Sequence, residues 1–381
     1  MSPRRLRIGI DGREFTQQKT GIARIFGPAF KELCHLKPEW EFYLFGNQRT
    51  VSPFEEDHLT FIRLPERFTF WWDQVTLVRY LKREKVDLFL SPYYKVPLSS
   101  PCPVIPIIHD LIYLSSSRYR SPRYLFYRPL FRTMGYLYAH RSCMILTDSF
   151  YSQEVINRFL KVSKEKIRVI YPGIETIFKP LKAVSELERL EQKYHFRRPY
   201  LLYVGNFKPH KEVPFLIKAY RRLPDSLKEK YQLVLAGPLD NICGVPLKKR
   251  VEQEGLSRQV IFTDHVGKDL PFLYGGAALF LFASSDEGFG FPPLEAMACG
   301  IPVIATRSAS LPEVIGEAGR LVPPGDAGVF SHAIEELLND ESARRLLVQR
   351  GFERVKHFTL EKQVKTLMQI LEEVLKGGVK K

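Results

Sequence analysis

The sequence predicts an α/β protein made of two doubly wound, Rossmann-like parallel-sheet domains with a cleft between them. Its 381 residues exceed the roughly 250 to 300 that one hydrophobic core usually covers. Short apolar runs alternate with longer amphipathic stretches, which is the pattern of strands joined by helices. This alternation stops once near the middle of the chain and then starts again, as expected for two domains.

The first half contains apolar runs that read as strands, separated by helical patterns such as Ile22–His35 and Trp72–Glu84. A strand, a helix and another strand in this order predict a parallel sheet covered by helices. The expected strands are Arg7–Asp11, Glu41–Phe45, Leu59–Arg63, Leu88–Ser91, Val104–His109, Met144–Thr147 and Ile167–Ile170.

The alternation stops at Tyr171–Pro180, where Pro and Gly precede a charged stretch, a composition typical of a domain boundary. We therefore expect a first domain over residues 1–178 and a second over 179–356, with 357–381 as a C-terminal helix. Apolar residues recur at helical spacing from Phe358 to Lys376. The strands expected in the second domain are Tyr200–Val204, Gln232–Ala236, Val260–Phe262, Ala278–Phe282, Pro302–Ala305 and Leu321–Val322.

Composition limits the environment and the partners of the chain. Lys and Arg number 57 against 42 Asp and Glu, and the net charge of +15 favours nucleic acid, nucleotide phosphates or acidic lipids as partners. Five scattered cysteines without a CxxC pair indicate neither a disulfide framework nor a zinc site. Neither a signal peptide nor a spanning apolar run of about 18 residues is present, so we expect a cytoplasmic protein, peripheral on a membrane at most.

The most informative loop follows the expected strand Ala278–Phe282 and carries two carboxylates, Glu287 and Glu295. Gly288 and Gly290 permit a tight turn and leave backbone amides bare for a ligand. Carboxylates accept hydrogen bonds from hydroxyls, and sugars are rich in hydroxyls. Taken alone, the loop also fits a plain turn in which Glu295 compensates a helix dipole.

A second loop, Gly205–Lys211, follows the strand Tyr200–Val204 and opens the expected helix Glu212–Leu223. A glycine turn at a helix N-terminus with Lys208 and Lys211 offers amides, a dipole and ammonium groups to an anion. The alternative is an exposed basic cap without a ligand.

Three further strand ends carry residues of interest. Gly21 opens a helix after the first strand and offers amides to a phosphate or a sugar, although a plain helix start explains it as well. His109 ends a buried strand, and the next residue, Asp110, either orients its ring or caps the next segment. Ser310 and Glu313 have the spacing of a capping box, and the amides at that helix start would also face phosphate.

Together these motifs resemble the GT-B retaining glycosyltransferases of family 4, whose E-x7-E motif matches the stretch from Glu287 to Glu295. The resemblance extends over Ile8–Ile25, Val104–Ile112, Arg168–Ile174, Tyr200–Tyr220 and Ile261–Asp326. It implies a GT-B fold in which the C-terminal helix crosses back onto the N-terminal, acceptor-binding domain. The second domain is then expected to hold a nucleotide sugar.

The resemblance also implies roles for individual residues. Glu287 would bond the hydroxyls of the donor sugar and Glu295 those of the ribose, while Lys211 and Lys208 would neutralise the diphosphate. Asn206 stands where the family commonly has Arg, so Lys208 is the candidate substitute. Catalytic roles fall to His109 and Glu287, and the expected donor-binding residues are Gly21, Asn206, Lys208, Lys211, Phe289, Gly290, Phe291, Glu295 and Leu311.

We expect no cofactor and no metal site, because lysines and helix N-termini would stabilise the leaving diphosphate and the chain has no Asp-x-Asp sequence. The co-substrate is a nucleotide diphosphate sugar. The motifs look most like mannosyltransferases of surface-polysaccharide assembly, which favours GDP-mannose, with a UDP-sugar as the alternative.

The stretch Leu111–Thr147 contains no Asp or Glu and interleaves arginines with aromatic residues. Such a surface suits lipid head groups, and it also suits stacking on single-stranded nucleic acid or a solvated basic face. Beside a sugar transferase we favour a saccharide or lipid-linked saccharide acceptor at the anionic inner leaflet, without nucleic acid. The candidate acceptor or membrane surface comprises Arg118, Arg120, Arg123, Arg128 and Arg132.

Two other classes of protein remain open at this point. A GT-B epimerase or phosphorylase would share the fold but catalyse a different reaction. A non-enzymatic basic protein that binds nucleic acid or membrane would explain the charge, but it would leave the loop from Glu287 to Glu295 unexplained.

Overall fold

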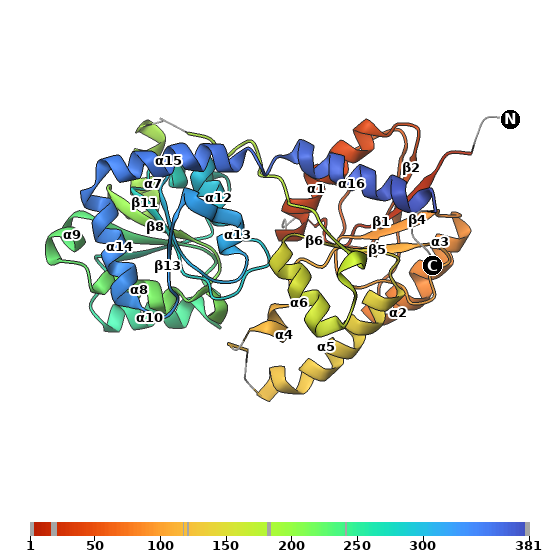
Figure 1. The fold of residues 1–381 in the computed structure, drawn as a ribbon, viewed down its shortest axis with the longest axis horizontal. Helices are drawn as coiled ribbons and strands as arrows, with labels where there is room; N and C mark the ends of the chain where they lie inside the picture. Colours follow the sequence, from red (N-terminus) through yellow and green to blue (C-terminus); the bar gives the residue numbers. More distant parts are fainter. Residues whose placement is uncertain are drawn as a thin grey trace. The chain divides into compact units, whose positions relative to one another are not determined.

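The computed structural model describes residues 4–16, 21–116, 118–119, 122–180, 184–240 and 242–377, apart from the side chains of residues 122–125 and 184. The chain forms two compact units. The first comprises Met1–Ser115, Ser121–Gly173 and Phe358–Lys381, and the second comprises Ser116–Arg120 and Ile174–His357. Each unit is an α/β structure with its own parallel sheet and flanking helices (Figure 1).

The first unit contains a five-stranded sheet in the order β3-β2-β1-β4-β5, and all of its pairings are parallel. Strand order reverses between β1 and β4, so the loops that follow these two strands leave the sheet at its switch point. A separate pair, β6-β7, is joined to the end of β5 by a bridge from Ile107 to Leu146. The strands are β1 Arg7–Asp11, β2 Glu41–Gly46, β3 Leu59–Arg63, β4 Leu88–Ser91, β5 Val104–Pro106, β6 Ile145–Thr147 and β7 Ile167–Val169.

The strand expected over Val104–His109 is therefore shorter than the apolar run predicts. Strand β5 ends at Pro106, which pairs with Ser91 of β4, and the Ile107 N–H still donates to the Ser91 carbonyl at 2.8 Å. The chain then pairs with β6 instead, since the Ile108 N–H donates to the Leu146 carbonyl at 2.8 Å. His109 consequently lies in a loop rather than in a strand.

The second unit contains a six-stranded parallel sheet in the order β10-β9-β8-β11-β12-β13. Its switch point lies between β8 and β11, which pair with each other through Leu201 and Leu279. The central strands are buried along most of their length, as expected for continuous apolar runs covered on both faces. The strands are β8 Tyr200–Val204, β9 Gln232–Ala236, β10 Val260–Asp264, β11 Leu279–Phe282, β12 Val303–Thr306 and β13 Arg320–Val322.

Helices surround both sheets (Figure 1). Those of the first unit are α1 Gly21–Leu36, α2 Thr69–Trp71, the π-helix η1 Trp72–Thr76, α3 Leu77–Arg83, α4 Ile112–Ser115, α5 Pro122–Arg141, α6 Phe150–Leu160, the 3-10 helix η2 Lys164–Lys166 and α16 Leu360–Leu375. Those of the second are α7 Val184–Tyr194, η3 Pro209–Lys211, α8 Val213–Arg221, α9 Asp225–Lys230, α10 Gly244–Gln253, η4 Gly267–Asp269, α11 Leu270–Gly275, α12 Phe291–Ala298, α13 Leu311–Ile315, η5 Gly316–Ala318, α14 Ala327–Asn339 and α15 Glu341–Val355.

The C-terminal helix α16 packs in the core of the first unit beside α1 (Figure 1). Its buried face includes Val364, Leu367 and Leu371, in line with the expected apolar stripe, and an ion pair of 2.5 Å joins Lys37 Nζ to Glu372 Oε1. The expected domain limits differ from the structure in two respects. The boundary lies between residues 173 and 174 rather than 178 and 179, and Ser116–Arg120 belongs to the second unit.

The helix expected over Trp72–Glu84 is divided into η1 and α3, and the short helix α2 precedes it. The π turn begins at Trp72, over whose ring the Arg13 guanidinium lies at 3.9 Å from the centroid. Arg13 also contacts Asp73 at 2.6 Å and Asp11 at 2.6 Å, so a buried charge network holds this turn. The π turn η1 contains one residue more than an α-helical turn, and in it both Trp72 and Asp73 contact Arg13.

The entry of α16 into the first unit depends on close backbone contact at Gly173. Its N–H donates to Gln363 Oε1 at 2.9 Å, and a Cβ atom at this position would lie 2.4 Å from the Leu360 backbone nitrogen. We expect Gly173→Ala to lower the free energy of unfolding by about 1 to 3 kcal/mol, because backbone must move to relieve the overlap. Urea denaturation followed by circular dichroism measures the change.

Gly27→Ala is the matched control for this substitution. Gly27 lies inside α1, where an added Cβ would meet only Phe15 at an ordinary distance of 3.5 Å. We expect this variant to lose less stability than Gly173→Ala, because the preference of Ala for a helix offsets part of the strain that a Cβ meets before Pro28. Equal stability of Gly173→Ala and wild type would contradict the packing argument.

Candidate active site

In the second unit, the loops that follow β8 and β11 are joined by an ion pair. Lys211 Nζ lies 2.5 Å from Glu287 Oε1, and the two side chains are only 12% and 10% exposed. Glu287 belongs to the loop after β11, and Lys211 ends η3 after β8. The switch point of the sheet thus places the two residues singled out in the sequence against each other.

The backbone of this site is held by small polar side chains. The His210 carbonyl accepts hydrogen bonds from Ser284 Oγ at 3.0 Å and from the Ser285 N–H at 2.8 Å. Ser310 Oγ donates to the carbonyls of Glu287 and Phe289 at 3.0 and 2.7 Å. The loop that carries Glu287 is therefore bonded on one side to the segment after β8 and on the other to the segment after β12.

Ser310 acts differently from the capping box that its spacing with Glu313 predicts. Its side chain makes no cap hydrogen bond to α13, and its backbone is helical rather than extended. The hydroxyl instead donates to the two loop carbonyls. The capping-box interpretation is wrong, and Ser310 is a support of the Glu287 loop.

Gly290 is required at the start of α12. It has φ of 103°, in the region that favours glycine, and a Cβ atom there would lie 2.8 Å from Leu311 Cδ2. Phe289 and Phe291 flank it with ring centroids 5.0 Å apart, and Phe289 is buried. The expected donor residues Phe289, Gly290, Phe291 and Leu311 therefore form one packed cluster.

Glu295 lies one turn into α12 and is 4% exposed. Tyr274, on α11, donates its hydroxyl to Glu295 Oε2 at 2.8 Å. This partner was missed in the sequence, where Tyr274 is one aromatic residue in an apolar helix. Only the fold brings the two residues together, since 21 positions separate them.

The remaining expected residues of the β8 loop have distinct positions. Asn206 accepts the Lys208 N–H at 3.2 Å through its side chain, which is a turn-forming contact. Lys208 is exposed, whereas Lys211 is nearly buried. Gly21 begins α1 in the first unit with open space around its Cα, and the residues just before it lie outside the described chain.

His109 lies in the first unit, with its side chain 14% exposed. Its Nδ1 is 2.7 Å from Asp148 Oδ2, and its Nε2 is 3.2 Å from the Pro92 carbonyl oxygen. Both partners can only accept, so each contact requires a proton on the ring. Burial opposes the charged ring, but Asp148 outweighs it, and the pKa of His109 is raised above its ordinary value.

Asp148, rather than Asp110, is thus the residue that orients the His109 ring. Asp110 Oδ1 accepts the Ile112 N–H at 3.1 Å and caps the start of α4, the second of the two roles considered for it. Asp148 follows β6 directly, so the strand-end argument applied to His109 would also have found it.

A cavity of 680 Å³ in the first unit has His109 in its wall. Tyr93 and Tyr94, which follow β4 at the switch point, lie with ring centroids 4.5 Å apart. Further lining residues include Ile22, Asp110, Tyr113, Tyr127 and Phe131. This aromatic cavity combines five Tyr and Phe rings with aliphatic side chains and with the polar groups of His109 and Asp110, a lining suited to sugars or other rings.

The arginines that were expected to share one surface lie in different environments in the structure. Arg118 forms an ion pair with Glu212 inside the second unit, so it is not part of the surface of α5. Arg128 is partly buried and donates to the Leu114 carbonyl, while Arg132 is exposed on α5. Arg120 and the side chain of Arg123 lie outside the described residues.

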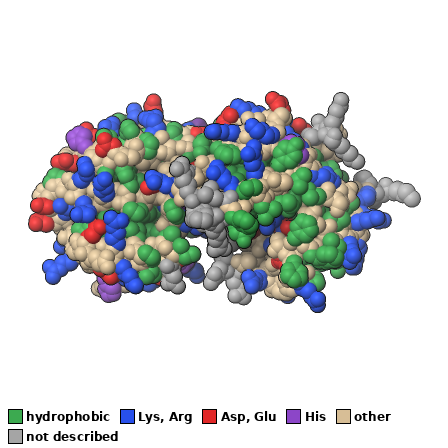
Figure 2. Space-filling model, turned by 90° about the horizontal axis from the view of Figure 1, so that it is seen from below, with side chains coloured by type: hydrophobic (Ala, Val, Ile, Leu, Met, Phe, Trp, Pro, Cys, Tyr) green, Lys and Arg blue, Asp and Glu red, His purple; other side chains and the backbone are tan. Residues whose placement is uncertain are grey.

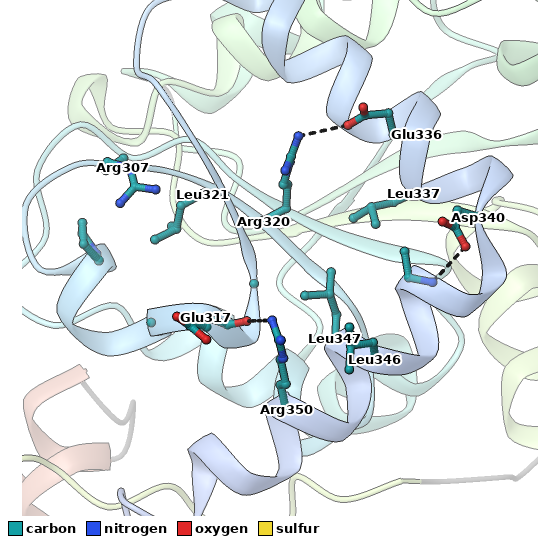
Figure 3. Close-up of a pocket in the computed structure, with 14 residues that line it drawn as sticks. Arg307, Glu317, Arg320, Leu321, Glu336, Leu337, Asp340, Leu346, Leu347 and Arg350 are labelled. Atoms are coloured by element: carbon teal, nitrogen blue, oxygen red, sulfur yellow. Dashed lines mark hydrogen bonds and ion pairs between the residues drawn. The ribbon is translucent and has the colours of Figure 1, made fainter.

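Another cavity, of 790 Å³, lies in the second unit along β13, η5, α14 and α15 (Figure 3). Its charged side chains bond within the protein: Arg320 pairs with Glu336 at 3.1 Å, and Arg350 donates to the Glu317 carbonyl at 3.4 Å. Its lining comes mainly from this edge of the sheet and not from the loops after β8 and β11, so it is a less suitable site for a charged substrate.

Among the residues that the structure describes, no three His, Cys, Asp or Glu side chains gather so that they could hold a metal ion. Within the same part of the chain, no helix is both long enough and apolar enough to cross a membrane.

Comparison with known proteins relates both units to sugar transferases. The family model for glycosyl transferases group 1 matches residues 186–354, and that for Glycosyltransferase Family 4 matches residues 38–178. The O-antigen chain mannosyltransferase B of Escherichia coli is 34% identical over 222 residues, which cover 57% of this chain and 57% of that protein. The serotype-specific mannosyltransferase WbdA of Escherichia coli is 31% identical over 67% of this chain and 31% of its own length. The chain thus spans between about a third and somewhat over half of these relatives.

Solved structures share the fold. Sucrose-phosphate synthase from Thermosynechococcus elongatus superposes with a TM-score of 0.76 at 20% identity, covering 98% of this chain and all of that one. HepE from Anabaena, in complex with UDP-glucose, gives a TM-score of 0.77 at 17% identity over 97% of this chain and all of that one. These neighbours are GT-B glycosyltransferases, and the expected GT-B fold is confirmed.

The pairing of His109 with Asp148 predicts a pH-dependent stability. The folded-state pKa of His109 is raised above the ordinary value of about 6.5. The charged pair therefore stabilises the first unit fully below about pH 6.5 and loses this contribution as pH rises through the folded-state pKa. We expect Asp148→Asn to lower the Tm most near pH 6, with a smaller difference from wild type at pH 8 to 9.

Thermal unfolding across this pH range measures the difference, and His109→Gln in the Asp148→Asn background serves as the control. A difference that stays constant or grows with pH would contradict the charged pair. In the control background, the pH dependence assigned to His109 should be absent.

Proposed function

We propose that this chain, which belongs to the GT4-like glycosyl transferases of group 1, is a hexosyltransferase that uses a nucleotide diphosphate sugar, with mannose as the favoured hexose. The acceptor is a saccharide or a lipid-linked saccharide in cell-surface polysaccharide synthesis. The observation that carries the proposal is the contact of Lys211 with Glu287, which joins a cation for phosphate and a carboxylate for hydroxyls at one switch point. Family models of glycosyl transferases match residues of both units, and this supports the proposal.

In this proposal the leaving diphosphate is stabilised by Lys211, with Lys208 as a second cation, and by backbone amides at the start of α12. Negative charge develops on the diphosphate as the bond to the sugar breaks. An ammonium group that is 12% exposed interacts with that charge more strongly than one in open water. No metal ion is required for this step.

The two carboxylates act as hydroxyl acceptors in the donor site. Glu287 bonds the hydroxyls of the transferred sugar, and the donor diphosphate replaces it as a partner of Lys211. Glu295 bonds the ribose hydroxyls, with its carboxylate oriented by the Tyr274 hydroxyl at 2.8 Å. Neither acts as an acid, a base or a nucleophile, because transfer needs neither residue to form a bond with the sugar.

The transfer itself exchanges one bond at the anomeric carbon. The acceptor hydroxyl oxygen bonds to that carbon on the face from which the diphosphate leaves, so the configuration is retained. The electron pair of the broken bond leaves with the diphosphate oxygen, which takes the proton of the acceptor hydroxyl. His109 transfers no proton in this proposal, because Asp148 and the Pro92 carbonyl engage both of its ring nitrogens.

GDP-mannose is the favoured donor, because the relatives with the most similar sequences include two named as mannosyltransferases. A UDP-sugar is the alternative, since HepE, of the same fold, is described with UDP-glucose. The acceptor is a saccharide in the aromatic cavity of the first unit, where Tyr93 and Tyr94 offer faces on which a sugar ring stacks.

We expect Lys211→Ala to raise the KM for the donor sugar about tenfold to a hundredfold, as removal of a charge-assisted contact costs about 1.5 to 3 kcal/mol. Binding of GDP and UDP should weaken by the same factor, because the ammonium contacts the phosphates that free and sugar-linked nucleotides share. Isothermal titration with both nucleotides, and transfer from GDP-mannose and UDP-glucose followed by product mass, measure these effects.

Lys193→Ala is the control for loss of an ion pair in the second unit, because Lys193 pairs with Asp269 at 2.6 Å on α7 and η4. It should leave nucleotide affinity unchanged. Equal affinity of wild type and Lys211→Ala for both nucleotides would exclude the assigned donor site. Epimerised or phosphorolysed sugar in place of a transfer product would identify a different reaction on the same fold.

We further propose that α5 rests on the anionic inner leaflet of the membrane and keeps a lipid-linked acceptor near the aromatic cavity. Phe126 is 79% exposed and Leu130 57%, and both lie on one helical face with Leu137. In Figure 2, seen from the side on which α5 lies in Figure 1, green hydrophobic and blue basic side chains share the surface of the first unit. Apolar side chains for the acyl region and arginines for phosphates are the two requirements of an interfacial helix.

A double substitution of Phe126→Ser and Leu130→Ser should weaken binding to vesicles of phosphatidylglycerol and phosphatidylethanolamine at least roughly tenfold, since each side chain gives up about 1.5 kcal/mol or more of burial. Ile242→Ser, at a residue 85% exposed in the second unit, is the matched control and should bind as wild type does. Sedimentation with the vesicles measures the bound fraction. Unchanged binding of the double variant would refute the role of α5.

A further inference from the structure

A short segment before α5 belongs to the second unit. Residues Ser116–Arg120 pack there, although α4 before them and α5 after them belong to the first unit. Tyr119 is 4% exposed, and its hydroxyl lies 2.7 Å from Nδ1 of His210. The neighbouring Arg118 pairs with Glu212. Arg118 and Tyr119 thus both contact the segment between β8 and α8.

His210 is the residue that ties together the two loops of the candidate donor site. Its side chain is 5% exposed, and its carbonyl accepts hydrogen bonds from Ser284 and Ser285 in the loop after β11. Lys211 follows it directly and contacts Glu287. The position of the His210 backbone therefore fixes where the Lys211 side chain leaves the chain.

The segment around His210 needs support from outside. Glu212 has φ of 52°, a left-handed conformation that costs a residue other than glycine about 1 kcal/mol or more. Such a conformation persists only where neighbouring contacts hold it. The contacts of the Ser116–Arg120 segment with His210 and Glu212 fall on either side of Lys211 and provide that support.

The His210 ring is held in a neutral form. Burial, and then the neighbouring Lys211, lower its pKa to about 4. A neutral ring has one N–H and one lone pair, so Nδ1 either accepts the proton of the Tyr119 hydroxyl or donates to its oxygen. In either case Tyr119 fixes the orientation of the ring, and the neutral ring adds no positive charge beside Lys211.

We propose that Tyr119 is a positioning residue of the donor site, which holds the His210 ring through its hydroxyl and thereby sets the backbone that presents Lys211 to a nucleotide diphosphate. The inference rests on the proposed function in one respect, namely that Lys211 binds the diphosphate. Tyr119 itself touches no substrate in this proposal.

Tyr119→Phe removes the hydroxyl and keeps the ring. We expect the affinity for GDP or UDP to fall about threefold to tenfold, the range for loss of one hydrogen bond, and the donor KM to rise by the same factor. The kcat should fall as well, because Lys211 also stabilises the charge that develops on the diphosphate during transfer. Isothermal titration and initial rates measure both quantities.

Tyr220→Phe is the matched control, because the Tyr220 hydroxyl is buried in the same unit and donates to the Tyr231 carbonyl at 2.8 Å. It should lower the Tm about as much as Tyr119→Phe does and leave nucleotide affinity unchanged. If Tyr119→Phe binds nucleotide as wild type does, or if Tyr220→Phe weakens binding equally, the positioning role is refuted.

A measurement without ligand separates this inference from the proposed function. The pKa of His210, about 4 in the folded protein, is followed by NMR without ligand and should change in Tyr119→Phe, which loses the hydrogen bond to Nδ1, and stay unchanged in Tyr220→Phe. Wild-type protein that binds neither GDP nor UDP would overturn the proposed function. An unaltered His210 pKa in Tyr119→Phe would overturn the positioning role whatever the nucleotide result.

Discussion

The contact between Lys211 and Glu287 is the interaction around which the second unit is organised. Two opposite charges that are 12% and 10% exposed lose much of their hydration, and their attraction offsets this cost only while both remain in place. A pair of apolar residues would serve stability as well, so the charges are better explained by a ligand that uses them. The serines that bond the adjacent loops keep the pair at the switch point of the sheet, where β8 and β11 open towards a ligand.

Much of the fold could be predicted from local sequence. Apolar runs placed the strands to within one or two residues in most cases, because a strand buried on both faces needs such a run whatever its neighbours are. The errors arose where contacts with other parts of the fold override the local pattern. Beyond Pro106 the apolar run pairs with β6, and Arg13 bonds Asp73 at a π turn inside an expected helix. The boundary between the units lies five residues before the expected one because Gly173 packs against α16.

The candidate site was predictable in its parts and less so in its connections. Glu287 and Lys211 follow from strand ends and loop composition, but their contact across 76 positions is set by strand order. Asp148 was within reach of the same argument as His109. Tyr119 and Tyr274 were not, since each is one aromatic residue among many until the fold brings it to His210 or Glu295. Ser310 had a sufficient local explanation, and for that reason its bonds to the loop carbonyls were overlooked.

The division of the chain into its units limits how its gene can be cut or recombined. The polypeptide passes from one unit to the other four times, after residues 115, 120, 173 and 357. A single cut therefore cannot separate the two units: a gene fragment for residues 174–357 would lose Tyr119, and a fragment for residues 1–173 would lose α16. Exchange of whole units between relatives requires several crossover points that match one another. Such a chain is expected to evolve by substitution within its loops more readily than by recombination of its halves.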